Sequence, residues 1–294
     1  MLHMIACVFI YRSRYDLILI DVYSIWNFYY AWAVANLARY LRIPYVPILH
    51  GGNLERRLIK NKRLSKTIFR YSAANVSPSL FLQHKFKEHG YASEYIPNSI
   101  ELAEYSFRPR RQVSPKLLFV RTLRAEYNPE MAVRVLHFLV ERGLAAELCF
   151  VGPEINNFIA ARLASLAEQL GVEERITYTG KLSKEAWVTL SEKFDIFINT
   201  TNFDNFPVSI IEAMSLGFPI VSTNVGGIPF IITHGMNGLL VEANDHQAMG
   251  QAIDRLVNDP DLAEKLSVNA RKFAEQLDWT VISTKWINLF QNVL

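Results

Sequence analysis

Two carboxylates, Asp204 and Glu212, flank an expected loop-to-helix turn. The apolar run 196–198 before it is typical of a buried strand, and polar residues 199–205 predict a loop. Pro207 suits the first helical turn, because its missing N–H would be unpaired there in any case. The free N–H groups of that turn carry partial positive charge and suit a diphosphate. The spacing also fits an ordinary helix with an acidic residue near its cap and a glutamate on a solvated face.

The turn belongs to a chain that alternates strands and helices. Apolar runs predict strands at 17–22, 45–49, 75–77, 94–96, 116–120, 147–151, 175–179, 195–198, 220–222 and 238–241. Helical spacing of apolar residues predicts helices at 1–10, 25–42, 54–70, 78–89, 129–142, 158–171, 184–192, 208–216, 246–258, 262–276 and 281–293. Such a rhythm favours parallel sheets and an α/β fold. We expect two Rossmann-like domains in tandem that face a cleft.

Composition narrows the function classes. The chain has 294 residues and a net charge of +3, which gives no reason to expect a nucleic-acid partner. Cys7 and Cys149 have no CxxC spacing, so we expect reduced thiols and a cytoplasmic protein. The apolar start at 1–10 indicates a buried helix rather than a signal peptide. Residues 259–261 read Asp-Pro-Asp, but no wider set of metal ligands accompanies them, so we expect no metal and no cofactor.

A set of motifs in one order then indicates a family. Residues 199–229 read NTTNFDNFPVSIIEAMSLGFPIVSTNVGGIP. This segment resembles the signature of retaining family 4 glycosyltransferases of the GT-B fold, which have two acidic residues separated by seven positions, then Ala-Met, a glycine, Pro-x-Val and Gly-Gly. Further similar motifs stand at 96–100, 150–153, 176–181 and 237–241, and the resemblance runs from about residue 16 to the C-terminus.

The resemblance implies roles for residues around the turn. Glu212 would hold the ribose hydroxyls of a nucleotide, and Asp204, one methylene shorter than the family's glutamate, would contact the donor sugar. Asn205 and Phe206 would line the sugar and phosphates. The remaining residues implied in substrate binding on this side are Pro207, Val208, Gly152, Gly180, Lys181, Gly226 and Gly227.

Two further groups follow from the resemblance. The family uses an arginine and a lysine to neutralise the donor diphosphate, on which negative charge develops as it departs. Here Arg121 or Arg124 would supply the cation, and Tyr127 stands at the lysine position and offers only a neutral hydrogen bond. His50, followed by Gly51, would lie near the donor sugar on the acceptor side. The alternatives are two surface arginines and a structural histidine.

The resemblance also implies a domain plan. Residues 1–108 would form the acceptor-side domain, 109–276 the nucleotide-sugar-binding domain, and 277–294 a helix that packs back on the first domain, with Trp286 and Leu289 as anchors. We interpret the charged segment 101–115 as the linker. The first domain contains too few strands, so we expect it to be truncated by about 60 residues at ~30 per βα unit.

The function implied is transfer of a sugar from a nucleotide-diphosphate sugar to a glycan or lipid-linked acceptor, in surface polysaccharide assembly. The basic segment 55–70 could lie on the inner face of an anionic membrane, although a solvated outer face explains it as well. The alternatives are a catalytically impaired remnant that binds nucleotide sugars, and another GT-B enzyme such as a sugar-nucleotide epimerase or a phosphorylase.

Overall fold

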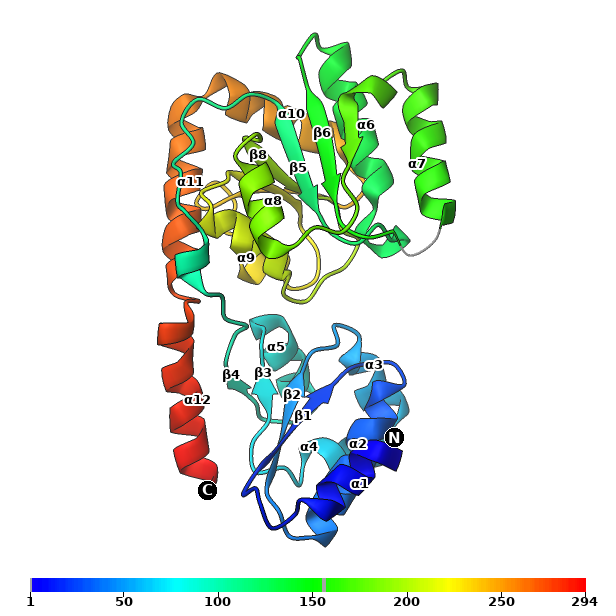
Figure 1. Ribbon diagram of the computed structural model, residues 1–294, viewed down its shortest axis with the longest axis vertical. Helices are drawn as coiled ribbons and strands as arrows, with labels where there is room; N and C mark the ends of the chain where they lie inside the picture. Colours follow the sequence, from blue (N-terminus) through cyan, green and yellow to red (C-terminus); the bar gives the residue numbers. More distant parts are fainter. Residues whose placement is uncertain (1, 155–156) are drawn as a thin grey trace. The chain divides into compact units, whose positions relative to one another are not determined.

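The computed structural model describes residues 2–154 and 157–294. The chain forms two compact units, each built on one parallel sheet (Figure 1). The N-terminal unit comprises residues 1–99 and 279–294, and the C-terminal unit comprises residues 100–278. The prediction of an α/β chain with two Rossmann-like domains is therefore confirmed.

The N-terminal unit has a four-stranded sheet with the strands in sequence order. These strands are β1 (Ile18–Val22), β2 (Tyr45–Leu49), β3 (Val76–Ser77) and β4 (Glu94–Tyr95). Its helices are α1 (Leu2–Ile10), α2 (Asn27–Tyr40), α3 (Leu54–Lys60), α4 (Lys62–Phe69), α5 (Leu80–Glu88) and α12 (Trp279–Val293). All neighbouring strands are parallel, as the alternation of strands and helices predicts.

The C-terminal unit has a six-stranded parallel sheet in the order β10-β9-β8-β5-β6-β7. Its strands are β5 (Lys116–Val120), β6 (Glu147–Val151), β7 (Ile176–Tyr178), β8 (Ile196–Asn199), β9 (Ile220–Thr223) and β10 (Leu239–Val241). Its α-helices are α6 (Pro129–Glu141), α7 (Asn157–Gln169), α8 (Lys184–Ser191), α9 (Val208–Ser215), α10 (His246–Asn258) and α11 (Pro260–Glu275). This is the strand order of a doubly-wound Rossmann sheet, in which the winding direction reverses between β5 and β8.

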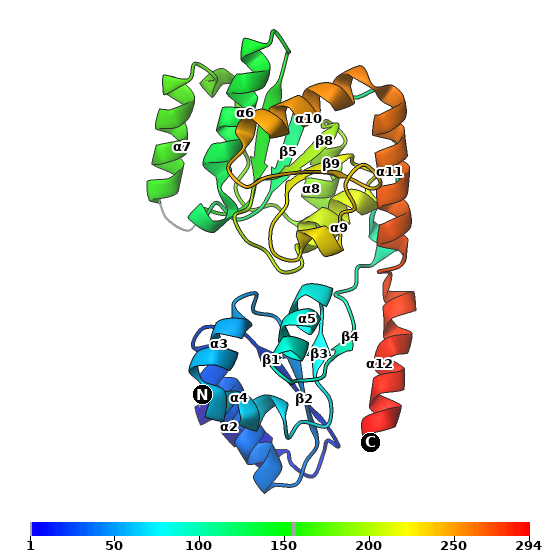
Figure 2. The same cartoon turned by 180° about the vertical axis from the view of Figure 1, so that it is seen from behind.

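The core of the C-terminal unit explains why the strands read as unbroken apolar runs. Helices α6, α7 and α10 pack together on one face of the sheet, and α9 and α11 pack together on the other (Figure 2). With both faces covered, every residue of β8 and of β9 is buried. Gly217 ends α9 with a φ of 79°, as predicted for a left-handed cap, and its missing Cβ admits the carbonyl oxygen of Arg108.

The single basic helix predicted at 54–70 is wrong. The chain breaks at Asn61, whose φ of −120° and ψ of 47° are not helical, and forms α3 and α4 instead. The break lets both short helices bury apolar side chains in the core of the N-terminal unit, Leu54 and Leu58 from α3 and Ile68 and Phe69 from α4. Helix α4 packs against α2 and α3, so tertiary packing overrides the continuous helical pattern.

The linker interpretation of residues 101–115 also needs correction. This segment belongs to the C-terminal unit and packs into it. Tyr105 is 2% exposed and Arg110 is 4% exposed. The guanidinium of Arg110 stacks on the Phe218 ring at 3.5 Å and donates to the carbonyl oxygens of Leu216 and Phe194. A charged, largely exposed segment therefore forms a strap that Tyr105 and Arg110 anchor to the C-terminal unit, because backbone carbonyls satisfy the buried arginine.

The boundaries between the units lie at residues 99/100 and 278/279, compared with the expected 108/109 and 276/277. Helix α12 belongs to the N-terminal unit, where Leu289 is buried and Trp286 is half-buried.

Within residues 2–154 and 157–294, no helix has the length and apolar character needed to cross a bilayer.

We predict that Arg110→Met destabilises the C-terminal unit by about 2–4 kcal/mol, because it removes buried, charged hydrogen bonds to the carbonyl oxygens of Leu216 and Phe194. The neighbouring Arg111→Met is the matched control: Arg111 is exposed and pairs with Asp261 and Glu264, so its loss should cost less than about 1 kcal/mol. Trp187 is the only tryptophan among residues 100–278, so ¹⁹F NMR of 5-fluorotryptophan during urea unfolding isolates this unit. Equal effects of the two substitutions would contradict the strap.

Candidate active site

The candidate site lies where the winding direction of the C-terminal sheet reverses, at the carboxyl ends of β5 and β8. Loops that leave these two strands are tied to one another. Thr200 donates through Oγ1 to the carbonyl oxygens of Tyr127 and Asn128, at 2.9 and 2.7 Å. Thr201 donates to the carbonyl oxygen of Glu126 at 3.2 Å. Ligands of open α/β sheets bind in the crevice at such a position.

An ion pair joins the two loops at the centre of the site. Arg121, after β5, pairs through Nη2 with Oδ2 of Asp204, after β8, and both side chains are largely buried. The Arg121 guanidinium also lies 4.3 Å from the centre of the Tyr127 ring. Burial lowers the pKa of Arg121, and the neighbouring Tyr127 and Glu126 act in the opposite direction. The structure therefore brings together Asp204, Arg121 and Tyr127, and the first two neutralise each other.

A glycine pair holds the backbone of this loop. The amide of Gly227 donates to the carbonyl oxygen of Asp204 at 2.8 Å. A Cβ on Gly227 would lie 1.8 Å from the carbonyl oxygen of Asn205, and a Cβ on Gly226 would lie 2.1 Å from that of Asp204. No side chain fits in either space. These two glycines thus form a turn against which residues 204–205 pack, and their place beside a nucleotide stays a prediction.

Gly152 permits a second close approach of loops. Its φ is 148°, and a Cβ there would lie 2.1 Å from the carbonyl oxygen of Arg121. The amide of Gly152 donates to the carbonyl oxygen of Gly180 at 2.9 Å. The ends of β5, β6 and β7 consequently meet at one edge of the sheet, and Lys181 follows directly on that edge.

Glu212 lies on α9, half-buried, and accepts a hydrogen bond from the Tyr105 hydroxyl at 2.6 Å. Burial raises the pKa of Glu212, although the Tyr105 hydrogen bond and the nearby Lys184 ammonium act in the opposite direction. Burial and the same carboxylate raise the pKa of Tyr105. The carboxylate is thus incompletely solvated and has one fixed donor, which leaves its other lone pairs available for a ligand.

A pocket of about 260 Å³ opens between these loops. The lining residues are Val120, Arg121, Thr122, Tyr127, Val151, Gly152, Pro153, Lys181, Leu182, Trp187 and Ser209. Two buried polar atoms in this lining, Nε of Arg121 and Oγ of Ser209, have no hydrogen-bond partner among the described residues. Buried polar atoms are rarely left unpaired, so this pair favours a polar group in the pocket, either a ligand or a water molecule.

The helix that follows the loop adds further polarity. Helix α9 starts after Pro207, and no side chain caps its first turn. Its N-terminal N–H groups and the exposed Lys181, which has no carboxylate partner in the described part of the chain, give this side of the site a positive character. Asn205, Phe206 and Pro207, the last residues of the loop, are buried, and Val208 is partly exposed.

Some predicted residues do not line this pocket. Arg124 is exposed, pairs with Glu126 at 3.2 Å and does not line the pocket. His50 and Gly51 belong to the N-terminal unit. There Nε2 of His50 lies 2.8 Å from Oδ1 of Asp21, and its ring stacks on that of Tyr23 at 5.2 Å. These contacts orient the imidazole at the carboxyl ends of β1 and β2, where a substrate role for it stays a prediction.

Sequence reasoning missed four residues of this site: Tyr105, Lys184, Trp187 and Ser209. Tyr105 lies 107 positions before Glu212, and no local pattern links them. Lys184 and Trp187 lie on α8, which reads as an ordinary amphipathic helix. Ser209 could have been found, because it is the second residue of a helix that was already expected to bind a diphosphate.

The chain is similar in sequence to known glycosyltransferases. The family described as glycosyl transferases group 1 matches residues 105–273. D-inositol 3-phosphate glycosyltransferase of Corynebacterium urealyticum is 26% identical over 201 residues, which are 67% of this chain and 44% of that protein. The amylovoran biosynthesis glycosyltransferase AmsK of Erwinia amylovora is 25% identical over 252 residues, which are 80% of this chain and 61% of that protein. The chain thus spans about half the length of such curated relatives.

Solved structures show the same fold. HepE from Anabaena, crystallised in complex with UDP, superposes with a TM-score of 0.86 at 19% identity, over 98% of this chain and 82% of that one. The GT-B architecture expected from the sequence is therefore confirmed.

We predict that Gly227→Ala displaces the loop at residues 204–205 and destabilises the C-terminal unit by roughly 1–3 kcal/mol, because the added Cβ overlaps a backbone oxygen that cannot move alone. Hydrogen exchange of segment 200–212 should become faster. Gly235→Ala is the control: its φ of 73° makes alanine unfavourable there, but its Cβ would meet nothing within 4 Å, so exchange at 200–212 should not change. Unchanged exchange in Gly227→Ala would refute the role of the glycine pair.

We also predict a pH-dependent effect of Glu212→Gln in the ligand-free protein. A carboxyl group whose pKa is raised on folding contributes stability below its unfolded pKa, and this contribution is lost as the pH rises through the folded value. Glutamine does not ionise, so the variant does not lose stability in this way. The free energy of unfolding of the variant, minus that of the wild type, should therefore increase as the pH rises above about 4.5, the ordinary pKa of a glutamate. Urea unfolding at pH 4, 5, 6 and 7 measures this difference, and a constant difference would contradict the raised pKa.

Proposed function

Because the chain belongs to the glycosyl transferases group 1 family, we propose that it transfers a sugar from a nucleotide-diphosphate sugar to an acceptor. The observation that carries this proposal is the polar, cationic pocket beside the uncapped start of α9. In this pocket Nε of Arg121 and Oγ of Ser209 have no hydrogen-bond partner among the described residues. A diphosphate offers the acceptor oxygens that these donors require.

Glu212 is proposed to accept hydrogen bonds from the nucleotide ribose. Its pKa is raised in the free protein mainly by burial, and the Tyr105 hydroxyl is the one fixed donor that the described residues give its carboxylate. Two ribose hydroxyls would supply such donors and favour the carboxylate. Tyr105 fixes the orientation of the carboxylate through its 2.6 Å hydrogen bond, which pre-organises Glu212 for the ligand.

Departure of the nucleoside diphosphate requires positive charge near its phosphates. Lys181, the N–H groups of α9 and the free Nε–H of Arg121 are the proposed sources. Asp204 neutralises most of the Arg121 charge in the free protein, so this pair would separate or share its hydrogen bonds when phosphate binds. Asp204 would then be free to contact the donor sugar. The family resemblance further implies retention of the anomeric configuration.

The acceptor is proposed to be a glycan or a lipid-linked saccharide in surface polysaccharide assembly. The name of AmsK, which refers to amylovoran biosynthesis, supports a polysaccharide product, and the complex of HepE with UDP supports a UDP-linked donor. Exposed basic residues of α4, such as Lys62 and Arg63, would suit a peripheral contact with an anionic membrane at the cytoplasmic face. No essential metal or cofactor is proposed.

One observation favours a second candidate, nucleotide-sugar binding without transfer. Tyr127 stands where the resembling family has a lysine, and the nearby Arg121 is neutralised by Asp204. A site with this deficit of cationic charge would bind a donor but stabilise its leaving group poorly. A radiolabelled-donor assay with polysaccharide and lipid-linked acceptors separates transfer, hydrolysis and binding alone.

Donor binding is tested by thermal unfolding with UDP-, GDP- and ADP-glucose. At 100 times its dissociation constant, the correct donor should stabilise the folded protein by about 2.7 kcal/mol, a rise in Tm of roughly 5–10 °C. Glu212→Ala should raise the dissociation constant roughly 10- to 100-fold, because it removes hydrogen bonds to a charged group. The exposed Glu168→Ala on α7 is the matched control and should keep the full shift. An unchanged shift in Glu212→Ala would disprove the assignment.

A further inference from the structure

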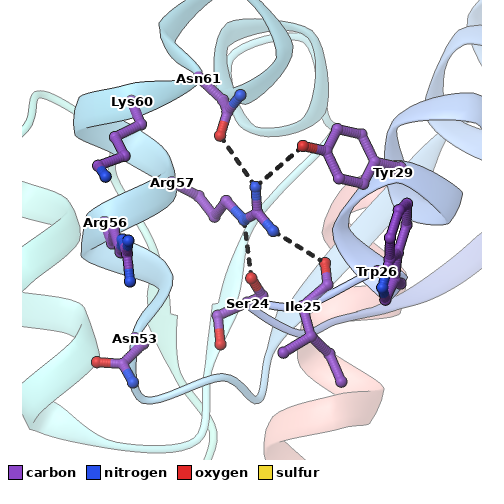
Figure 3. A pocket seen from close by; sticks show the side chains of 9 residues that line it. All are labelled: Ser24, Ile25, Trp26, Tyr29, Asn53, Arg56, Arg57, Lys60 and Asn61. Carbon is purple, nitrogen blue, oxygen red and sulfur yellow. Dashed lines mark hydrogen bonds between the residues drawn. The ribbon is translucent and has the colours of Figure 1, made fainter.

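The N-terminal unit contains a separate pocket of about 530 Å³ at the carboxyl ends of its first two strands (Figure 3). Residues just after β1 form one wall, and helix α3 with its flanking asparagines forms the other. The lining residues are Ser24, Ile25, Trp26, Tyr29, Asn53, Arg56, Arg57, Lys60 and Asn61. Three of them are cations and none is a carboxylate, so the pocket concentrates positive potential.

Arg57 builds the floor of this pocket. Its Nε donates to the carbonyl oxygen of Ser24 at 2.7 Å, and its Nη1 donates to the Tyr29 hydroxyl and to Oδ1 of Asn61 at 3.1 and 3.2 Å. Its Nη2 donates to the carbonyl oxygen of Ile25 at 3.3 Å. All four partners are neutral, so the guanidinium is held rigidly while its charge stays uncompensated.

Arg56 and Lys60 lie one helical turn apart on α3 and extend along the same wall (Figure 3). Both are exposed, and neither forms an ion pair with any residue in the described part of the chain. Like charges four positions apart repel each other by a few tenths of a kcal/mol in an isolated helix. A bound anion would remove this repulsion, and the amide of Asn53 lies at the base of the same wall.

Trp26 supplies an apolar surface on the opposite wall. This residue is 75% exposed, and its ring lies 6.0 Å from that of Tyr29. A large aromatic group at the rim of a pocket offers a flat face and an N–H donor to a ligand. The axial C–H bonds of a pyranose ring make one face of a sugar apolar, and this face fits against indole.

We propose that this pocket binds a phosphorylated saccharide, with Arg56 and Lys60 on the phosphate and Trp26 against the sugar ring. The inference rests on the proposed glycosyl transfer, for which this molecule would be the acceptor or its terminal part. The volume matches a ligand of one or two sugar rings with a phosphate. The concave form favours such a compact ligand over a flat membrane surface, and the cations favour it over a neutral glycan.

The test is isothermal titration of the full chain with glucose 6-phosphate, glucose and inorganic phosphate, without any nucleotide sugar. Glucose 6-phosphate should bind more tightly than either fragment and lose affinity as salt is added. Arg56→Ala/Lys60→Ala should weaken it about tenfold or more. Trp26→Ala should weaken glucose 6-phosphate while leaving inorganic phosphate unchanged. Equal binding by wild type and the double variant, or no binding by wild type at millimolar concentrations, would overturn the proposal.

Lys62→Ala/Arg63→Ala is the matched control. It removes two exposed cations from α4 that do not line the pocket, and it should bind glucose 6-phosphate like the wild type. Cosedimentation with phosphatidylglycerol–phosphatidylcholine vesicles addresses a lipid surface: binding that depends on Arg56 and Lys60, together with no affinity for glucose 6-phosphate, would overturn the proposal. The titration contains no nucleotide sugar, so a negative result refutes only the saccharide pocket. A negative thermal-shift result with Glu212→Ala refutes only the donor assignment.

Discussion

The candidate active site depends on one backbone contact, between Gly226–Gly227 and the carbonyl groups of Asp204–Asn205. Any Cβ at these glycines would overlap a backbone oxygen, so the loop after β8 can occupy its position only because the loop after β9 has no side chains there. That position aligns Asp204 with Arg121, and the threonines that follow β8 then bind the loop after β5. Two sequence-distant loops thereby form a single wall.

Three arginines show that the hydrogen-bond acceptors around a buried or half-buried guanidinium decide whether it can still bind a ligand. Arg110 is satisfied by backbone carbonyls and an aromatic ring, and burial lowers its pKa to about 9, so it acts as a structural strap. Arg121 is neutralised by a carboxylate and keeps one unpaired donor. Arg57 is surrounded by neutral acceptors, so it is fixed in place and still charged. Only the last two leave charge or donors for a ligand.

The two units therefore present different kinds of binding surface. The C-terminal unit combines loops from several parallel strands with one helix N-terminus, an arrangement suited to a diphosphate and a ribose. The N-terminal unit combines charged side chains of a short helix with an exposed indole, an arrangement suited to a charged sugar. The proposed donor and acceptor would require this division of recognition chemistry.

The sequence by itself determined the alternation of parallel strands and helices, the Gly217 cap and the turn that carries Asp204 and Glu212. These features rest on local patterns: apolar runs, helical spacing, and the conformations that glycine and proline allow. Only the tertiary structure showed that the charged segment 101–115 packs into the C-terminal unit, that Tyr105 binds Glu212, and that the basic helix breaks at Asn61. Each of these depends on contacts between distant residues, or on which apolar side chains a shared core can accept. No local pattern encodes such contacts.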